Sequence, residues 1–424
     1  DLHYPLRRQR QMCIRDRLIR HVVPILVMLK VVHDWLRAFS SDASESRNPL
    51  AFEQTQWWFL CTIGALSPIL NNQDINFLKD ESFWKGCFTG QELPFEIHES
   101  SPDLWLNNVI SMMNNERIAV GMQGLGVAEI SYQNALLYAK DRLQGRDLKG
   151  AKKPSEEADP LLVHPDIRRM LLRAKALIDS SRMLSAWTAL AIDKSVKDPD
   201  EKVRKANNDL VELMTPIIKS ILTDYGVEIS SEMLQIFGGH GYIREYGMEQ
   251  FYRDARIAPI WEGTNGIQAM DLAGRKMPQG MGRLLRRFFH PALAFIEDNR
   301  SDENLKEFVI PFEKALKGLQ KTSMFMAQKG LSNPYEIGAA ASDYMKQFGL
   351  VSMGYMWLLM LKTAFSKQDE DDFYKNKVII GRFFFERILP ETLSRAIAIG
   401  SGSRTMMSLP DDGFESANKF SGKA

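Results

Sequence analysis

The chain has 424 residues, of which 54 are basic, 53 are acidic and 45% are hydrophobic. At roughly 150 residues per domain, this length predicts two or three domains with sizeable cores. A net charge of +1 lacks the basic excess that binding to a phosphate backbone requires, which argues against nucleic acid as a partner.

The three cysteines, Cys13, Cys61 and Cys87, are odd in number and have no CxxC spacing. This pattern favours neither a disulfide framework nor a zinc site, and it predicts a reducing, cytoplasmic location. The seven histidines show no HExxH or other paired spacing, so no metal site is predicted.

Residues 1–108 differ in character from the rest of the chain. They hold all the cysteines and five of the eight tryptophans, with little helical or strand periodicity. Their longest apolar run, residues 22–29, is far shorter than the roughly 20 residues that cross a bilayer. We interpret residues 1–108 as a segment that is poorly ordered or not native to the fold.

Helical periodicity begins at Val109, and we predict an all-α fold from that residue onward. A charged, proline-containing stretch over 149–165 predicts an exposed loop. Residues 109–277 are predicted to form a four-helix bundle. Its expected helices span residues 109–144, 166–196, 201–225 and 228–238.

Residues 278–424 are predicted to form a separate helical extension. Its expected helices span residues 302–330, 334–366 and 371–399. The stretch 348–365 is apolar on most faces, and we interpret it as a buried core helix rather than a membrane span, because Lys362 and the break over 352–354 limit the unbroken run.

The segment QIFGGHGYIREYGMEQFYRDARI runs from Gln235 to Ile257. Gly238 and Gly239 permit positive φ and the close approach of a ligand, although on spacing alone a plain helix–helix turn is the better explanation. A second glycine group, Gly121, Gly124 and Gly126, lies within a predicted helix. We interpret this group as a sign of tight helix packing.

Glu262 lies in the apolar segment IAPIWEGTNGIQAMDLAGRK, just before Thr264, a candidate N-cap. A helix N-terminus favours the charged carboxylate, whereas burial favours the neutral acid. Such a group can accept a proton in catalysis, or can simply be a first-turn charge.

Arg142 and Arg146 are spaced i,i+4 at the end of the first predicted helix. On one helical face both could meet a phosphate or a carboxylate. The alternative is a solvated helix terminus whose cations complement the helix dipole.

Four segments in order, residues 112–146, 235–242, 252–257 and 260–268, resemble the C-terminal half of the acyl-CoA dehydrogenase family. The tail from about residue 278 is similar to a helical extension in one branch of that family, which includes the 3-methylmercaptopropionyl-CoA dehydrogenases. The family's N-terminal helical domain and middle β-barrel have no counterpart in the motifs of residues 1–108.

The resemblance implies an FAD-dependent α,β-dehydrogenation of an acyl-CoA thioester. Glu262 would remove the α-proton, while FAD accepts the β-hydride. It further implies a homodimer that passes electrons to an electron-transferring flavoprotein or a similar acceptor. The alternative is a non-catalytic helical protein that keeps the bundle for oligomerisation or partner binding.

The family's other site residues are carried over by position. The flavin contacts would be Arg142, Gln144, Gln235, Ile236, Phe237, Gly238, Gly239, Thr264, Asn265 and Gly266. The contacts to the substrate would be Asn114, Arg117 and Gly263. In the family, the contact made by residues 235–239 crosses a subunit interface.

Overall fold

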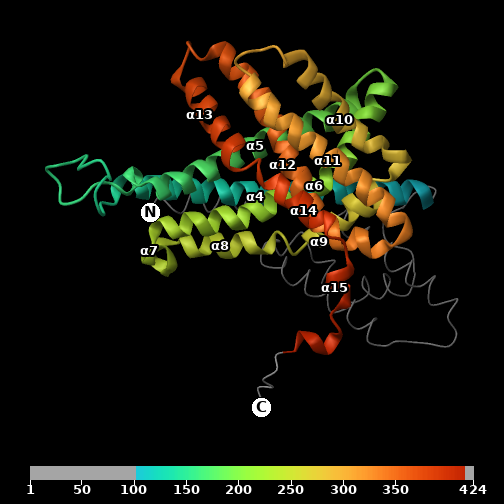
Figure 1. The fold of residues 1–424 in the computed structure, drawn as a ribbon, viewed down its shortest axis with the longest axis horizontal. Coiled ribbons are helices and arrows are strands. Elements are labelled where there is room, and N and C mark those ends of the chain that lie inside the picture. The colour runs from blue at the N-terminus through green and yellow to red at the C-terminus, as the bar shows by residue number, and fades with distance from the viewer. Residues whose placement is uncertain (1–101, 416–424) are drawn as a thin grey trace, which may run out of the picture. The chain divides into compact units, whose positions relative to one another are not determined.

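A computed structural model describes residues 102–415 of the chain, with side chains from residue 114 onward. Within this range the chain is helical and has no β-strand, which confirms the predicted all-α class (Figure 1). One isolated bridge joins Leu143 to Pro160. The interpretation of residues 1–108 concerns positions that lie almost entirely outside the described residues.

The main helices follow one another along the chain, and the longest connection between them is the loop over residues 142–164. They are α4 (Pro102–Asp141), α5 (Pro165–Lys197), α6 (Glu201–Phe237), α7 (Gly239–Tyr242), α8 (Met248–Ile257), α9 (Asn265–Met270), α10 (Gln279–Asn299), α11 (Lys306–Ser332), α12 (Pro334–Lys367), α13 (Asp372–Arg387), α14 (Glu391–Gly400) and α15 (Arg404–Ser408). A π-helical turn over Asp271–Lys276 continues α9.

The bundle consists of α4, α5, α6 and α8, with α5 and α8 both packed against α6. The prediction of separate helices over 201–225 and 228–238 was wrong, because α6 continues through both. The apparent break at Gly226 is a packing position, since a Cβ there would lie 2.9 Å from the carbonyl oxygen of Gly124.

Glycines bring α4 and α6 close together. A Cβ on Gly124 would lie 2.6 Å from the carbonyl oxygen of Leu222, and one on Gly121 would lie 2.7 Å from a methyl group of Ile218. Tight packing is therefore confirmed for these two residues. It does not apply to Gly126, where an added Cβ would meet nothing within 4 Å.

The extension begins with α10, a helix that the sequence prediction did not delimit. The prediction of one continuous helix over 371–399 was also wrong, because this stretch is divided into α13 and α14 around Pro390. In contrast, the helices expected over 302–330 and 334–366 correspond to α11 and α12.

Helix α12 is the centre of the core. It is long and apolar enough to cross a membrane. However, 72% of its most apolar 18-residue stretch is buried within the protein, as expected for a core helix. Trp357 is fully buried and donates from Nε1 to the carbonyl oxygen of Ala176 on α5, at 3.2 Å. Helix α12 also packs on α6 and α9, so the extension supports the bundle directly.

Candidate active site

Glu262 lies in the turn between α8 and α9, and its backbone is left-handed, with a φ of 54°. Gly263 follows with a φ of 80°, and a Cβ there would lie 2.7 Å from Nε2 of Gln268. Thr264 then caps α9, since its Oγ1 accepts from the backbone N–H of Ile267 at 3.3 Å, as predicted. A left-handed glutamate is uncommon, and such conformations concentrate at functional sites.

The carboxyl group of Glu262 is partly buried, and burial raises its pKa above the usual value for glutamate. The negative charge of Glu116 raises that pKa further, whereas Arg117 and Lys219 act in the opposite direction. These three charges come from α4 and α6, so both helices set the proton affinity of Glu262.

The surface beside Glu262 is unusually apolar for exposed positions. Trp261 is 44% exposed and Ile267 is 57% exposed. Ile257, Ile260 and Met270 are exposed as well. A group of large apolar side chains on a surface marks a place where a ligand or another protein segment binds.

Asn265 ties the Glu262 turn to α6. Its Nδ2 donates to Asp224 Oδ1 at 2.7 Å and to the carbonyl oxygen of Ser220 at 3.1 Å, while its Oδ1 accepts from Lys219 Nζ at 2.9 Å. Lys219 is fully buried, and burial lowers its pKa to about 8. Because the side-chain amide of Asn265 is used in this way, a flavin contact from Asn265 would have to come from its backbone.

Several buried polar atoms near this turn lack hydrogen-bond partners within the described residues. They are Oε1 of Gln268, Nε of Arg117 and Oδ2 of Asp271. The Nε2 of Gln268 makes only long contacts of 3.4 Å to the carbonyl oxygens of Glu262 and Gly263. Arg117 and Asp271 form an ion pair with each other, with 3.9 Å between Nη1 and Oδ2. Unsatisfied buried polar atoms are rare, and a bound ligand is one explanation for them.

The predicted flavin contacts Arg142, Gln144 and residues 235–239 form a second group. They lie at the end of the bundle where α4 meets α7. Helix α4 ends at Asp141, so the expected pairing of Arg142 and Arg146 on one helical face was wrong. The chain turns at Gly145, with a φ of 72°, and Arg146 donates to the carbonyl oxygens of Lys153 and Glu156.

At this end, Gln235, Gly238 and Gly239 are exposed, and a Cβ on either glycine would meet nothing within 4 Å. Ile236 is buried and Phe237 stacks on Tyr138 at 4.0 Å between ring centroids. The sequence reasoning did not include three aromatic residues of this cluster. They are Tyr138, His240 and Tyr246.

The two groups of predicted site residues are far apart within one chain. Arg117 lies 15 residues into α4 and Arg142 directly follows its last residue, so a rise of about 1.5 Å per residue separates them by roughly 35–40 Å. Asn114 lies one helical turn from Arg117, in the group that contains Glu262. Arg142 and Gln144 are exposed at the other end, near residues 235–239.

Two family models match the chain. "Acyl-CoA dehydrogenase, C-terminal domain" covers residues 106–277, and "Acetyl-CoA dehydrogenase C-terminal like" covers residues 288–410. The chain belongs to the acyl-CoA dehydrogenase family.

Two curated members of the family illustrate the similarity. A 3-methylmercaptopropionyl-CoA dehydrogenase of Ruegeria pomeroyi is 45% identical over 43% of this chain and 30% of the relative. The broad-specificity linear acyl-CoA dehydrogenase FadE5 of Mycobacterium tuberculosis is 29% identical over 76% of this chain and 56% of the relative. The chain thus spans about half or less of the length of these relatives.

A solved acyl-CoA dehydrogenase from Bacillus anthracis, complexed with FAD, has the same fold with a TM-score of 0.56. It is 22% identical, and the alignment covers 72% of this chain and 52% of that structure.

Proposed function

We propose that this chain is the C-terminal part of an FAD-dependent acyl-CoA dehydrogenase in which Glu262 is the catalytic base. The observation that carries the proposal is the setting of Glu262. Its backbone is left-handed, its carboxyl group is partly buried with a raised pKa, and exposed apolar side chains lie beside it. A base of this kind removes the weakly acidic α-proton of a thioester.

The surrounding residues have complementary roles in this proposal. Arg117 and Lys219 favour the ionised form of Glu262, which is the form that accepts the proton. The apolar surface around Trp261 would shield the acyl chain and exclude water. When bound, FAD supplies the acceptor for the β-hydride.

Two features fit a flavin, and they also support a homodimer. The exposed glycines of residues 238–239 leave open space above the backbone, and Arg142 supplies an exposed cation at the same end of the bundle. This end is too distant to serve Glu262 of the same chain, so a second copy would have to bring it there. The electron acceptor is proposed to be an electron-transferring flavoprotein, and the cytoplasmic location stays a prediction.

Glu262→Gln tests the assignment of the base. The full chain is purified, its flavin content is measured by absorbance near about 450 nm, and an acyl-CoA is added without oxygen. We expect 3-methylmercaptopropionyl-CoA or butyryl-CoA to bleach the parent flavin. Glu262→Gln should keep the flavin, but the rate of bleaching should fall by several orders of magnitude, because the amide cannot accept the proton.

Glu297→Gln, at an exposed position on α10, is the matched control and should bleach like the parent. Undiminished bleaching in Glu262→Gln would show that another group is the base. If the parent chain binds no flavin and is not bleached, the alternative of a non-catalytic helical protein is favoured for this polypeptide.

A further inference from the structure

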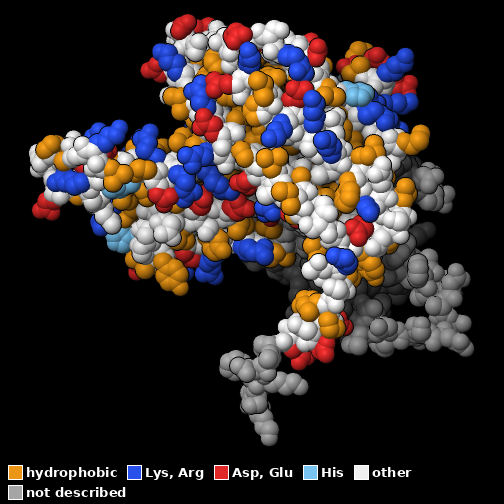
Figure 2. All heavy atoms as spheres, viewed as in Figure 1, with side chains coloured by type: hydrophobic (Ala, Val, Ile, Leu, Met, Phe, Trp, Pro, Cys, Tyr) orange, Lys and Arg blue, Asp and Glu red, His pale blue; other side chains and the backbone are white. Residues whose placement is uncertain are grey.

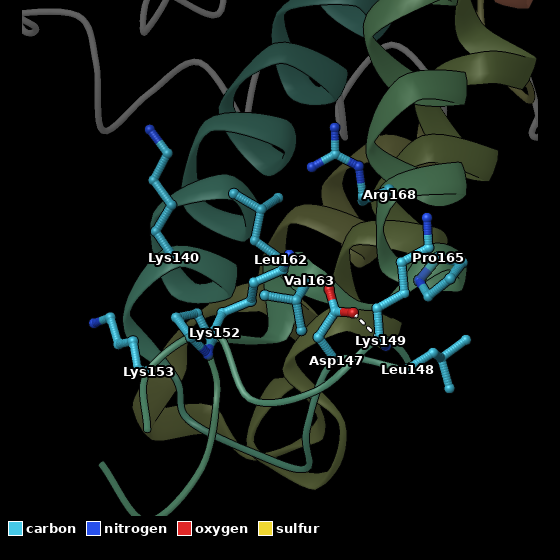
Figure 3. A pocket seen from close by; sticks show the side chains of 11 residues that line it. Lys140, Asp147, Leu148, Lys149, Lys152, Lys153, Leu162, Val163, Pro165 and Arg168 are labelled. Carbon is cyan, nitrogen blue, oxygen red and sulfur yellow. Dashed lines mark hydrogen bonds between the residues drawn. The ribbon is translucent and has the colours of Figure 1, made fainter. Parts of the chain in front are cut away.

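The loop between α4 and α5 (residues 142–164) borders a hollow of about 660 Å³ that belongs to neither group of predicted site residues (Figure 3). Its lining includes five cations, which are Lys140, Lys149, Lys152, Lys153 and Arg168. None of them forms an ion pair with any residue in the part of the chain that the structure describes.

Acidic residues do not balance this charge. Asp147 is the one acid in the lining, and its Oδ1 accepts from the backbone N–H of Lys149 at 2.8 Å. Five cations around one hollow repel one another, and the two nearby carboxylates, Asp147 and the buried Asp159, offset only part of that charge. Figure 2 shows basic side chains on the surface at this end of the bundle.

A buried carboxylate holds the loop in shape. Asp159 is fully buried and accepts from the backbone N–H groups of Asp147, Lys152 and Lys153 at 2.7–3.0 Å. These bonds, that of Asp147 first, lower the pKa of Asp159 to about 2, so it is ionised at neutral pH. These bonds fix the backbone at Lys152 and Lys153, so the positions from which these two side chains extend are set before any ligand arrives.

The centre of the hollow is apolar. Figure 3 shows Leu162 and Val163 in the middle of the lining, with Lys140 and Lys153 on one side and Arg168 on the other. The first residue of α5, Pro165, also lines the hollow, so the positive end of this long helix adds to the field there.

The hollow is distinct from the predicted flavin contacts. Tyr138 points toward α7, since its hydroxyl group lies 2.8 Å from Nδ1 of His240. Lys140 follows two residues later, about 200° around the helix, and therefore faces the opposite way. Neither Arg142 nor any of residues 235–239 lines the hollow.

We propose that this hollow binds a nucleoside polyphosphate, with phosphates against the cations and the base against Leu162 and Val163. Its volume lies within the range of small-molecule sites, and its concave apolar centre favours a compact ligand over a flat macromolecular surface. The proposal does not depend on the dehydrogenase activity.

Calorimetric titration of the full chain with ADP is the test. Lys149→Gln/Arg168→Gln should weaken ADP binding by at least about tenfold, because two charge-assisted contacts are lost. Lys140→Gln/Lys152→Gln, on the other cations, should do the same. All four side chains are exposed, so both variants should melt at the parent temperature.

Lys314→Gln/Lys321→Gln on α11 is the matched control and should bind ADP like the parent, since these exposed lysines are remote in sequence from the loop. Equal weakening in the control, or no ADP binding at millimolar concentration, would overturn the proposal. So would loss of ADP binding in Arg142→Gln alone, which would place the nucleotide on the flavin segments.

Three further probes separate the possible sources of negative charge. Inorganic phosphate and pyrophosphate should bind more weakly than ADP, because they cannot use the apolar centre. A poly-glutamate peptide and vesicles of phosphatidylcholine and phosphatidylglycerol serve as macromolecular probes. Their binding should be the same for the parent and for the two double variants of the hollow. If either probe binds in place of ADP, the hollow is a macromolecular contact and the proposal fails.

Discussion

Helix α12 and the Glu262 turn are built in opposite ways. On α12 the large side chains Trp357, Tyr344 and Phe348 are fully buried, and the hydroxyl group of Tyr344 pairs with Ser323 Oγ at 2.8 Å. At the Glu262 turn, by contrast, Trp261, Ile267 and other large apolar side chains are exposed. The first region is arranged for stability, whereas the second gives up stability in the manner of a binding site.

Trp357→Ala should have the largest effect on stability. Truncation leaves a cavity in the core and removes the hydrogen bond to Ala176, so the free energy of unfolding should fall by about 3–5 kcal/mol. Urea denaturation followed by circular dichroism measures the change. A loss below about 1 kcal/mol would contradict the central role of α12.

Trp261→Ala, at the Glu262 turn, is the matched control because it removes the same side chain. Trp261 is 44% exposed, so its truncation should cost less than about 1 kcal/mol. Similar losses for both tryptophans would erase the contrast between the two regions.

Gly124→Ala should separate α4 from α6 and thereby disturb the support of the Glu262 turn. The new Cβ would lie 2.6 Å from a backbone carbonyl oxygen, which cannot move aside like a flexible side chain. We expect a loss of about 1–3 kcal/mol in unfolding free energy.

Gly126→Ala, two residues along α4, provides the control for that substitution. Its Cβ meets nothing within 4 Å, so higher helix propensity should stabilise the protein by about 0.5–1 kcal/mol. Opposite signs for the two glycines are the expected result, and equal signs would refute the packing interpretation.

Apolar periodicity predicted most of the helical fold, because burying one face of a helix leaves a regular pattern in the sequence. It failed where glycine or proline had an unexpected role. Helix α6 continues through Gly226, where the close approach of Gly124 leaves no room for a side chain, a contact that local sequence cannot reveal. The break between α13 and α14 at Pro390 was missed within an apolar stretch that looks continuous.

The candidate site was only partly predictable. The segments around Glu262 and Gly238 were found from motifs, and the Thr264 cap followed from local chemistry. The roles of Lys219 and Asp224 could not be found, because a lysine and an aspartate within an amphipathic helix look like ordinary surface residues. Lys219 is buried and Asp224 is partly buried, and both pair with Asn265, which lies more than 40 positions away in the sequence.

Lys219 should make stability depend on pH. Its pKa is lowered from 10.5 to about 8, so above pH 8 the folded chain holds fewer protons than the unfolded chain. The free energy of unfolding should therefore rise as the pH increases from about 8 toward 9.5, below the range in which tyrosines titrate. Urea midpoints across this window measure the rise.

Lys219→Met removes the titrating amine, so the rise with pH should shrink even though the variant is less stable overall. The exposed Lys314→Met should keep the parent's pH dependence. An unchanged slope in Lys219→Met would mean that the buried amine does not lose its proton in this range.

Glu262→Gly should have a small effect on the free energy of unfolding, with a stabilising sign. Glycine removes the strain of a left-handed residue but adds entropy to the unfolded chain, which leaves a net gain of about 0.5–1 kcal/mol. Met281 is the matched control, since its φ is also 54° and its side chain is 92% exposed. Because only Glu262 carries a partly buried carboxyl group, Glu262→Gly should stabilise the chain more than Met281→Gly. Equal gains would mean that the free energy lost at Glu262 comes from its backbone conformation alone. Destabilisation by Glu262→Gly would show that the glutamate side chain supports the turn.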